Sequence, residues 1–171
     1  MSGAPTTPGL DGVSPHRGSD GRVDAVQFHL AALPPAECPV QHRFTPGLYA
    51  REIFMPAGAM VVSRVHKTEH PYVVLSGRAL VYVEGIGVAD LRGGHVGITT
   101  PGTRRVLYML EDTRWITFHP TPETDMEKLQ DELTETPDVS YVGDSADEQA
   151  PEIFQQLRDA AARLQLLNEA L

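Results

Sequence analysis

The chain has 171 residues, 41% of them hydrophobic and 22% charged, which is the composition of an ordinary globular protein with one domain-sized core. Its formal net charge of −9 comes from residues 123–171, where thirteen acidic side chains stand against three basic ones. Such a segment repels phosphate backbones and no basic stripe offsets it, so we expect no nucleic acid partner. The one cysteine, Cys38, excludes an internal disulfide and a cluster of zinc-bound thiolates.

The N-terminal residues 1–43 are expected to form an arm ahead of the folded domain. Residues 1–23 are rich in glycine, proline, serine and threonine and cannot bury enough apolar surface to fold alone. The segment 24–33, DAVQFHLAAL, fits either a short helix or a strand, and Pro34 and Pro35 end it. There is neither the apolar core of a signal peptide nor a run of about 20 apolar residues, so we expect a cytoplasmic protein without a membrane partner.

Residues 44–120 have the pattern of a β-barrel. Short β-prone runs recur about every ten residues, with glycine or proline between them and no helical periodicity, which favours an antiparallel sandwich or barrel. The predicted strands are residues 48–54, 60–66, 71–76, 79–84, 95–99, 104–110 and 113–119.

Residues 121–171 are predicted to form an acidic, helical C-terminal extension. Thr121-Pro122 supplies an N-cap and a first helical residue, and Met126, Leu129 and Leu133 then make one apolar stripe.

A second helix is predicted to open at Pro151. Its apolar residues are spaced as in a heptad repeat: Ile153, Leu157, Ala160, Leu164, Leu167 and Leu171. This seam can pack on the barrel or pair with the same helix of another subunit, and the sequence leaves both interpretations open. Because sheet edges are commonly closed by pairing, the arm and the helix 151–171 predict a homodimer or a larger symmetric assembly.

Residues 65–77, VHKTEHPYVVLSG, hold the strongest candidates for a metal site. His66 and His70 lie on the two sides of a short turn, where their imidazoles can converge on one point, and imidazole suits Zn, Fe, Ni and, with carboxylates, Mn. Strand alternation turns Glu69 to the other face, but a break in the alternation would make it a carboxylate ligand. The alternative interpretation is two structural histidines bonded to carbonyl groups at a barrel rim.

The runs HKTEHPYVVLSG, PGTRRVLY and EDTRWITFHPT resemble the cupin superfamily, in particular small single-domain cupins of bacteriophage and prophage genomes. Anchored on Gly77, the first cupin motif has His66 at its second histidine position. His70 then stands at its glutamate position and Arg64 at its first histidine position. The resemblance covers residues 44–119 and implies an all-β, cupin-like antiparallel jelly-roll barrel, here with an N-terminal arm and a C-terminal helical extension.

The second cupin motif, anchored on Gly102, opens at Gly94 and has Arg105 at its histidine position and Met109 at its asparagine position. The glycine spacing therefore matches the family, whereas the ligand set does not.

The cupin strand order also implies that the last strand lies beside the strand that carries His70. His119 can then supply a third imidazole, with Trp115 and Thr117 below it on the same face. The alternative interpretation is a histidine at a strand end, before Pro120, that faces solvent. Arg64 and Arg105 are expected to point into the cavity and to bind a carboxylate or phosphate, with Tyr72 and Tyr108 lining it. The alternative for the two arginines is a structural ion pair with Glu52, Glu84 or Glu111.

Two classes of function follow. One is a barrel that binds a divalent metal ion, a small anionic ligand or both, with metal-dependent catalysis on a small metabolite left open. The other is a non-catalytic jelly roll that binds a protein partner in an assembly, such as a decoration or cement-type component of a phage virion. A jelly roll serves either class.

Overall fold

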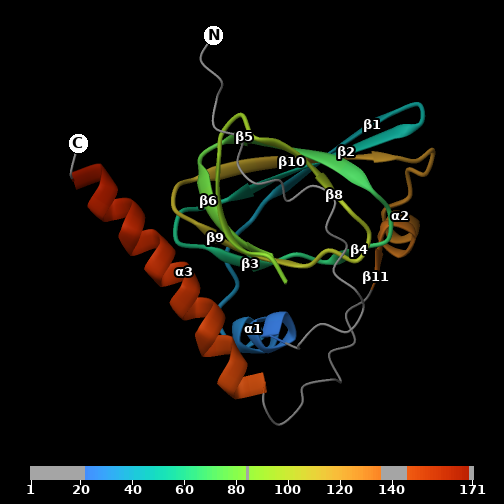
Figure 1. Ribbon diagram of the computed structural model, residues 1–171. Coiled ribbons are helices and arrows are strands. Elements are labelled where there is room, and N and C mark those ends of the chain that lie inside the picture. The colour runs from blue at the N-terminus through green and yellow to red at the C-terminus, as the bar shows by residue number, and fades with distance from the viewer. Residues whose placement is uncertain (1–21, 84, 136–145, 170–171) are drawn as a thin grey trace.

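The computed structural model describes residues 22–83, 85–135 and 146–169, and its centre is two antiparallel sheets packed face to face (Figure 1). One sheet has the order β1-β2-β10-β5-β8 and the other the order β3-β9-β6-β7. The strands of the first sheet are β1 (Val40–Thr45), β2 (Leu48–Met55), β10 (Thr113–Pro120), β5 (His70–Ser76) and β8 (Val96–Thr99). Those of the second are β3 (Met60–Val62), β9 (Arg105–Met109), β6 (Arg78–Val83) and β7 (Gly87–Arg92).

This strand order is that of a jelly roll. Along the chain from β2 to β10 the strands pass back and forth between the sheets, so that β2-β10-β5-β8 faces β3-β9-β6-β7 as two interleaved Greek keys. The predicted all-β, cupin-like jelly-roll barrel is therefore confirmed. A further small sheet pairs β4 (Val65–His66) with β11 (Thr134–Glu135).

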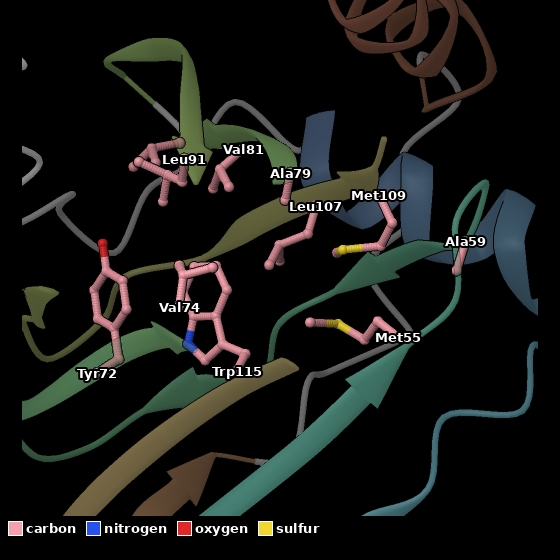
Figure 2. Packing of buried hydrophobic residues seen from close by; sticks show 11 residues of the cluster. Met55, Ala59, Tyr72, Val74, Ala79, Val81, Leu91, Leu107, Met109 and Trp115 are labelled. Carbon is pink, nitrogen blue, oxygen red and sulfur yellow. The ribbon is translucent and has the colours of Figure 1, made fainter. Parts of the chain in front are cut away.

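The barrel interior is filled by the inward-facing residues of both sheets, as strand alternation requires. Figure 2 shows side chains of the two sheets meeting between them. This interior cluster comprises Met55, Ala59, Tyr72, Val74, Ala79, Val81, Val83, Leu91, Leu107, Met109 and Trp115.

A second core lies outside the barrel, where α1 (Arg22–Ala31) and α3 (Ala146–Glu169) pack together against the sheet of β6 (Figure 1). Strand β6 is consequently buried on both faces. Ile153 and Leu157 of α3 are fully buried against a cluster that includes Leu80 and Tyr82, so the first half of the predicted seam packs within the chain. The side chains of residues 166–171, with the last two positions of the seam, lie outside the described part, and assembly through this helix stays a prediction.

From residue 22 on, the N-terminal segment is more structured than an arm, whereas the rest of the predicted arm lies outside the described residues. Residues 24–33 fall mostly within α1, so the helix is the conformation found. Arg104, from the β8–β9 connection, binds Asp24 and Gln27 of this helix and fastens it to the barrel. Strand β1 begins at Val40, four residues before the expected start of the barrel.

Three element boundaries differ from the expectations. Helix α2 (Met126–Leu133) is capped by Asp125, whose carboxylate accepts from the backbone N–H groups of Glu127 and Lys128 at 3.1 Å, and not by the pair at 121–122. Helix α3 begins at Ala146, so Pro151 lies within it. The predicted strand 60–66 is divided into β3 and β4, and β1, β7 and β11 were not predicted.

No helix of the described ranges is long and apolar enough to cross a membrane.

On the outer face of β2, Glu52 joins three strands. Its carboxylate accepts from Arg43 of β1 at 2.8 Å and from Nε of Arg114 of β10, also at 2.8 Å. The hydrogen bonds from Arg114, then those from Arg43, lower the pKa of Glu52 below its ordinary value. Glu52 therefore pairs with two arginines on the outer face of the sheet and does not neutralise an arginine inside the barrel.

Replacing Gly77 by alanine should destabilise the barrel strongly. Gly77 has φ +85°, and a Cβ there would lie 2.3 Å from the carbonyl oxygen of Asp112 and 2.7 Å from Cα of Thr113. Gly58 is the control, because its φ of +81° is similar but a Cβ would meet no atom within 4 Å. In urea unfolding we expect Gly58→Ala to lose about 1–3 kcal/mol from strain, and Gly77→Ala to lose clearly more. Equal losses would contradict the close approach.

Replacing Glu52 by glutamine should reduce the amount by which the free energy of unfolding falls at acid pH. A carboxyl group whose pKa is lower in the folded than in the unfolded state stabilises the fold above its unfolded pKa, about 4.3 for glutamate. That contribution is lost as the pH falls through the native pKa. Denaturant unfolding between pH 3 and pH 7 should show a steeper acid loss in the wild type than in Glu52→Gln, and parallel profiles would refute the role of this ion pair.

Candidate metal centre

Three histidines meet at one end of the barrel interior. His66 ends β4, His70 begins β5 and His119 lies near the end of β10. One ring nitrogen from each lies within 4.8 Å of those of the other two. The ring centroids of His70 are 4.3 Å from those of both His66 and His119. The structure thus brings together the three residues that the sequence proposed as ligands.

Strand pairing explains this convergence. Strand β10 lies between β2 and β5 in the five-stranded sheet. Alternation then turns His70 inward together with Tyr72, and His119 inward together with Thr117. The KTE turn between β4 and β5 returns the chain so that His66 faces the same point.

Each of the three rings has a nitrogen without a hydrogen-bond partner among the described residues. These buried atoms are Nδ1 of His66, Nε2 of His70 and Nδ1 of His119. The opposite nitrogens of two rings are bonded: Nδ1 of His70 to the carbonyl oxygen of Thr68 at 3.1 Å, and Nε2 of His119 to Oγ1 of Thr117 at 3.0 Å. Because a carbonyl oxygen only accepts, Nδ1 of His70 carries the proton and Nε2 presents its lone pair.

Unpartnered nitrogens in one place fit a metal ion better than a structural role. Leaving a buried polar atom unsatisfied costs about 1–3 kcal/mol, so three together are expensive unless they bind something. The bond to Thr68 accounts for one nitrogen of His70, as the structural interpretation proposed, but leaves the other unexplained.

The environment keeps the imidazoles neutral. Burial, followed by the neighbouring imidazoles, lowers the pKa of His66 to about 3. Burial, then His70 and Arg51, lowers the pKa of His119 to about 3. Burial also lowers the pKa of His70. Neutral imidazole is the form that coordinates metal ions, so these rings need no deprotonation first.

The triad lines a cavity of about 410 Å³ between the two sheets and α2. The pairing of β2 with β10 orders its walls in layers, since His119 is opposite Tyr49, Thr117 opposite Arg51 and Trp115 opposite Ile53. From one end to the other, the cavity is therefore lined by histidines, then by charged side chains, and finally by apolar residues that form its floor. The floor residues are Ile53, Met55, Val61, Leu107 and Trp115.

The charged layer is entirely basic. Arg51, Arg64 and Arg105 line the cavity, and no aspartate or glutamate is among its described lining residues. Burial lowers the pKa of Arg51, and the nearby charge of Arg64 adds to this effect.

Arg105 is the most buried of the three. It is 5% exposed, and its Nη1 donates to Oγ1 of Thr99 at 3.1 Å. Its guanidinium carbon lies 5.3 Å from the ring centre of Tyr72, and that ring stacks on Trp115 at 4.7 Å. Tyr72 thus supports Arg105 from the core and does not itself line the cavity.

Besides Tyr72, two of the predicted site residues lie elsewhere. Tyr108 packs in the outer cluster that includes Ile153 and Leu157, because it alternates with Arg105 and Leu107 of the same strand and so faces away from the cavity. Glu69 is exposed in the turn and does not belong to the histidine group.

Arg64 and the described acidic residues proposed as partners of the arginines lie at the edge of the cavity or away from it. Arg64 lies at the rim and is exposed. Of the proposed acidic partners, Glu52 is on the outer face, Glu111 is exposed, and Glu84 lies outside the described residues.

Sequence reasoning missed Arg51, Tyr49 and His42. The hydroxyl of Tyr49 and Nδ1 of His42 are hydrogen-bonded at 2.7 Å, and the Tyr49 ring stacks on His119 with centroids 5.7 Å apart. No motif marks these residues. The available signal was the alternation along β2, which places Tyr49, Arg51 and Ile53 on one face once the register against His119 is known.

No protein-family model matches the chain, and no curated protein matches its sequence. Solved structures similar in fold include ectoine synthase from P. lautus, with 14% identity, a TM-score of 0.48, and 60% of this chain and 78% of that chain covered. An RmlC-like cupin with a double-stranded beta-helix fold from Methanocaldococcus jannaschii has 9% identity, a TM-score of 0.44 and coverage of 52% and 84%. The Cnp3 cupin domain of Schizosaccharomyces pombe has 20% identity, a TM-score of 0.43 and coverage of 64% and 82%. These likenesses concern the fold alone, and by its own strand order the chain is a jelly roll.

Proposed function

We propose that the barrel binds one divalent metal ion through His66, His70 and His119, and holds a small organic anion beside it. The observation that carries the proposal is that each of the three rings has a buried nitrogen without a partner among the described residues, and that the rings lie close enough to place one nitrogen of each within 4.8 Å of those of the other two. Such a site would suit metal-dependent catalysis on a small metabolite. The protein is an enzyme if the bound anion is a substrate.

Three imidazoles are suitable for Zn, Fe, Mn or Ni, and they leave coordination positions for other ligands. A bound ion of this kind would polarise a ligand oxygen or lower the pKa of a bound water molecule. The donation from His70 to Thr68 fixes that ring's orientation, as a partner of a ligating histidine commonly does.

The anionic character of the ligand follows from the cavity walls. Guanidinium groups pair with carboxylates and phosphates in two-point hydrogen bonds, and here Arg51 lines a space whose described lining residues include no carboxylate. The volume of about 410 Å³ is in the lower range of small-molecule sites. Because the floor below the arginines is apolar, we propose a carboxylate or phosphate with a compact apolar body.

A non-catalytic component of an assembly or a phage virion is the alternative function that the sequence suggested. It remains a hypothesis. The buried triad favours the metal-binding proposal, because a purely structural jelly roll has no use for three unpartnered imidazole nitrogens.

Removing a triad histidine should abolish stoichiometric metal binding. We expect chelator-treated wild type to take up about one equivalent of Zn²⁺ or Co²⁺, measured by calorimetry and elemental analysis, and His70→Ala and His119→Ala to lose it. His29→Ala, the same change in α1, is the control and should bind as the wild type does.

A second readout separates a metal site from a structural triad. His66→Leu removes an unpartnered polar atom from the metal-free protein, so its metal-free melting temperature should stay level or rise. A wild type that binds no metal, or a metal-free His66→Leu that is strongly destabilised, would overturn the proposal.

Metal-loaded protein should prefer an anion with an apolar body. In calorimetric titrations we expect benzoate to bind more tightly than acetate, and neutral benzamide not to bind. Arg51→Met should weaken benzoate binding by roughly ten- to a hundred-fold, since hydrogen bonds to charged groups contribute about 1.5–3 kcal/mol. Arg92→Met, on the exposed surface of β7, is the control. Equal binding of benzoate and benzamide would contradict the role of the guanidinium groups.

A further inference from the structure

We propose that the segment formed by α2 and β11 completes the metal centre, so that metal binding and docking of this segment strengthen each other. The inference rests on the proposed metal site, and it concerns how one ligand, His66, is held.

The three candidate ligands are on strands that differ in how they are paired. His70 and His119 belong to β5 and β10, which pair with each other and with further strands of the five-stranded sheet. His66 is on the two-residue strand β4, and among the described residues β4 pairs with β11 alone, Thr134 being opposite His66. Two ligands are therefore fixed by the barrel, whereas the sheet partner of the third comes from the C-terminal extension.

Further hydrogen bonds join the extension to the residue after the ligand. The backbone N–H of Lys67 donates to the carbonyl oxygen of Leu133 at 2.9 Å, and its ammonium group to the carbonyl oxygen of Asp131. On the barrel side, the carbonyl oxygen of His66 accepts from the N–H of Gly102 at 2.9 Å. The His66 peptide is thus held between the extension and the β8–β9 turn.

Helix α2 also reaches a second ligand. Its two buried leucines, Leu129 and Leu133, pack on Tyr49, and the ring of Tyr49 stacks on His119. Both leucines line the cavity that the triad shares. Loss of this packing would therefore loosen the support of His66 and remove a contact behind His119.

The segment formed by α2 and β11 is small, so the coupling should be measurable. An eight-residue helix is not stable alone in water, and α2 depends on its docked leucines. If docking raises the metal affinity, the bound metal must stabilise docking by the same factor, because coupling between two binding events is reciprocal.

The test compares two equally buried leucines in the full chain. Leu129 of α2 is 2% exposed and Leu157 of α3, on the outer face of the opposite sheet, is 1% exposed. For Zn²⁺ binding by calorimetry, we expect Leu129→Ala to weaken the affinity at least tenfold. Leu157→Ala should lower the melting temperature but keep the affinity within about threefold of the wild type.

The reciprocal effect is measured on the wild type, which removes any dependence on the folding of a variant. Saturating Zn²⁺ should slow amide hydrogen exchange in residues 126–135 and leave residues 153–165 unchanged. A wild type that binds zinc, with an unaltered Leu129→Ala affinity and unchanged exchange in 126–135, would overturn the coupling and leave the metal site standing. A wild type that binds no zinc would instead refute the proposed function itself.

Discussion

The antiparallel pairing of β10 with β5 is the interaction on which the candidate site depends. It places Thr117 opposite Tyr72 and Trp115 opposite Val74, and so sets which side chains of both strands face the interior. The same register turns His119 and His70 toward one point, and the pairing of β10 with β2 adds Arg51 one layer below. A slip of β10 by one residue would send its own inward-facing side chains, Trp115, Thr117 and His119, to the outer face, so this strand's part of the core and of the site is specified together.

The site also concentrates polar groups that do not favour folding by themselves. Among the described residues, three imidazole nitrogens have no hydrogen-bond partner, and the arginine whose pKa is lowered by burial lines a cavity to which no described carboxylate contributes. The rest of the chain is acidic overall, so this basic interior is a local exception rather than a consequence of composition. Such local costs are typical of positions kept for binding, and the two cores on either side of β6 provide the stability that tolerates them.

Much of the fold and part of the site could be predicted from the sequence. The spacing of His66 and His70 around a turn indicated their convergence, and the family resemblance supplied His119. Tyr108 was wrong for a reason visible in the sequence, because it is three residues from Arg105 and strand alternation separates the two faces. Arg51 could not be found in this way, since its inward orientation depends on a strand register that only tertiary pairing determines. The start of α2 was likewise wrong, because the sequence predicted a cap at Thr121-Pro122 whereas Asp125 caps the helix.

The most direct test of the account is the anomalous diffraction of a crystal of the zinc-loaded protein, recorded on the two sides of the zinc absorption edge. We predict a single peak between the three imidazoles, with zinc–nitrogen distances of about 2.0–2.1 Å to His66, His70 and His119. An empty triad, with the anomalous signal on the acidic C-terminal segment or absent, would contradict it.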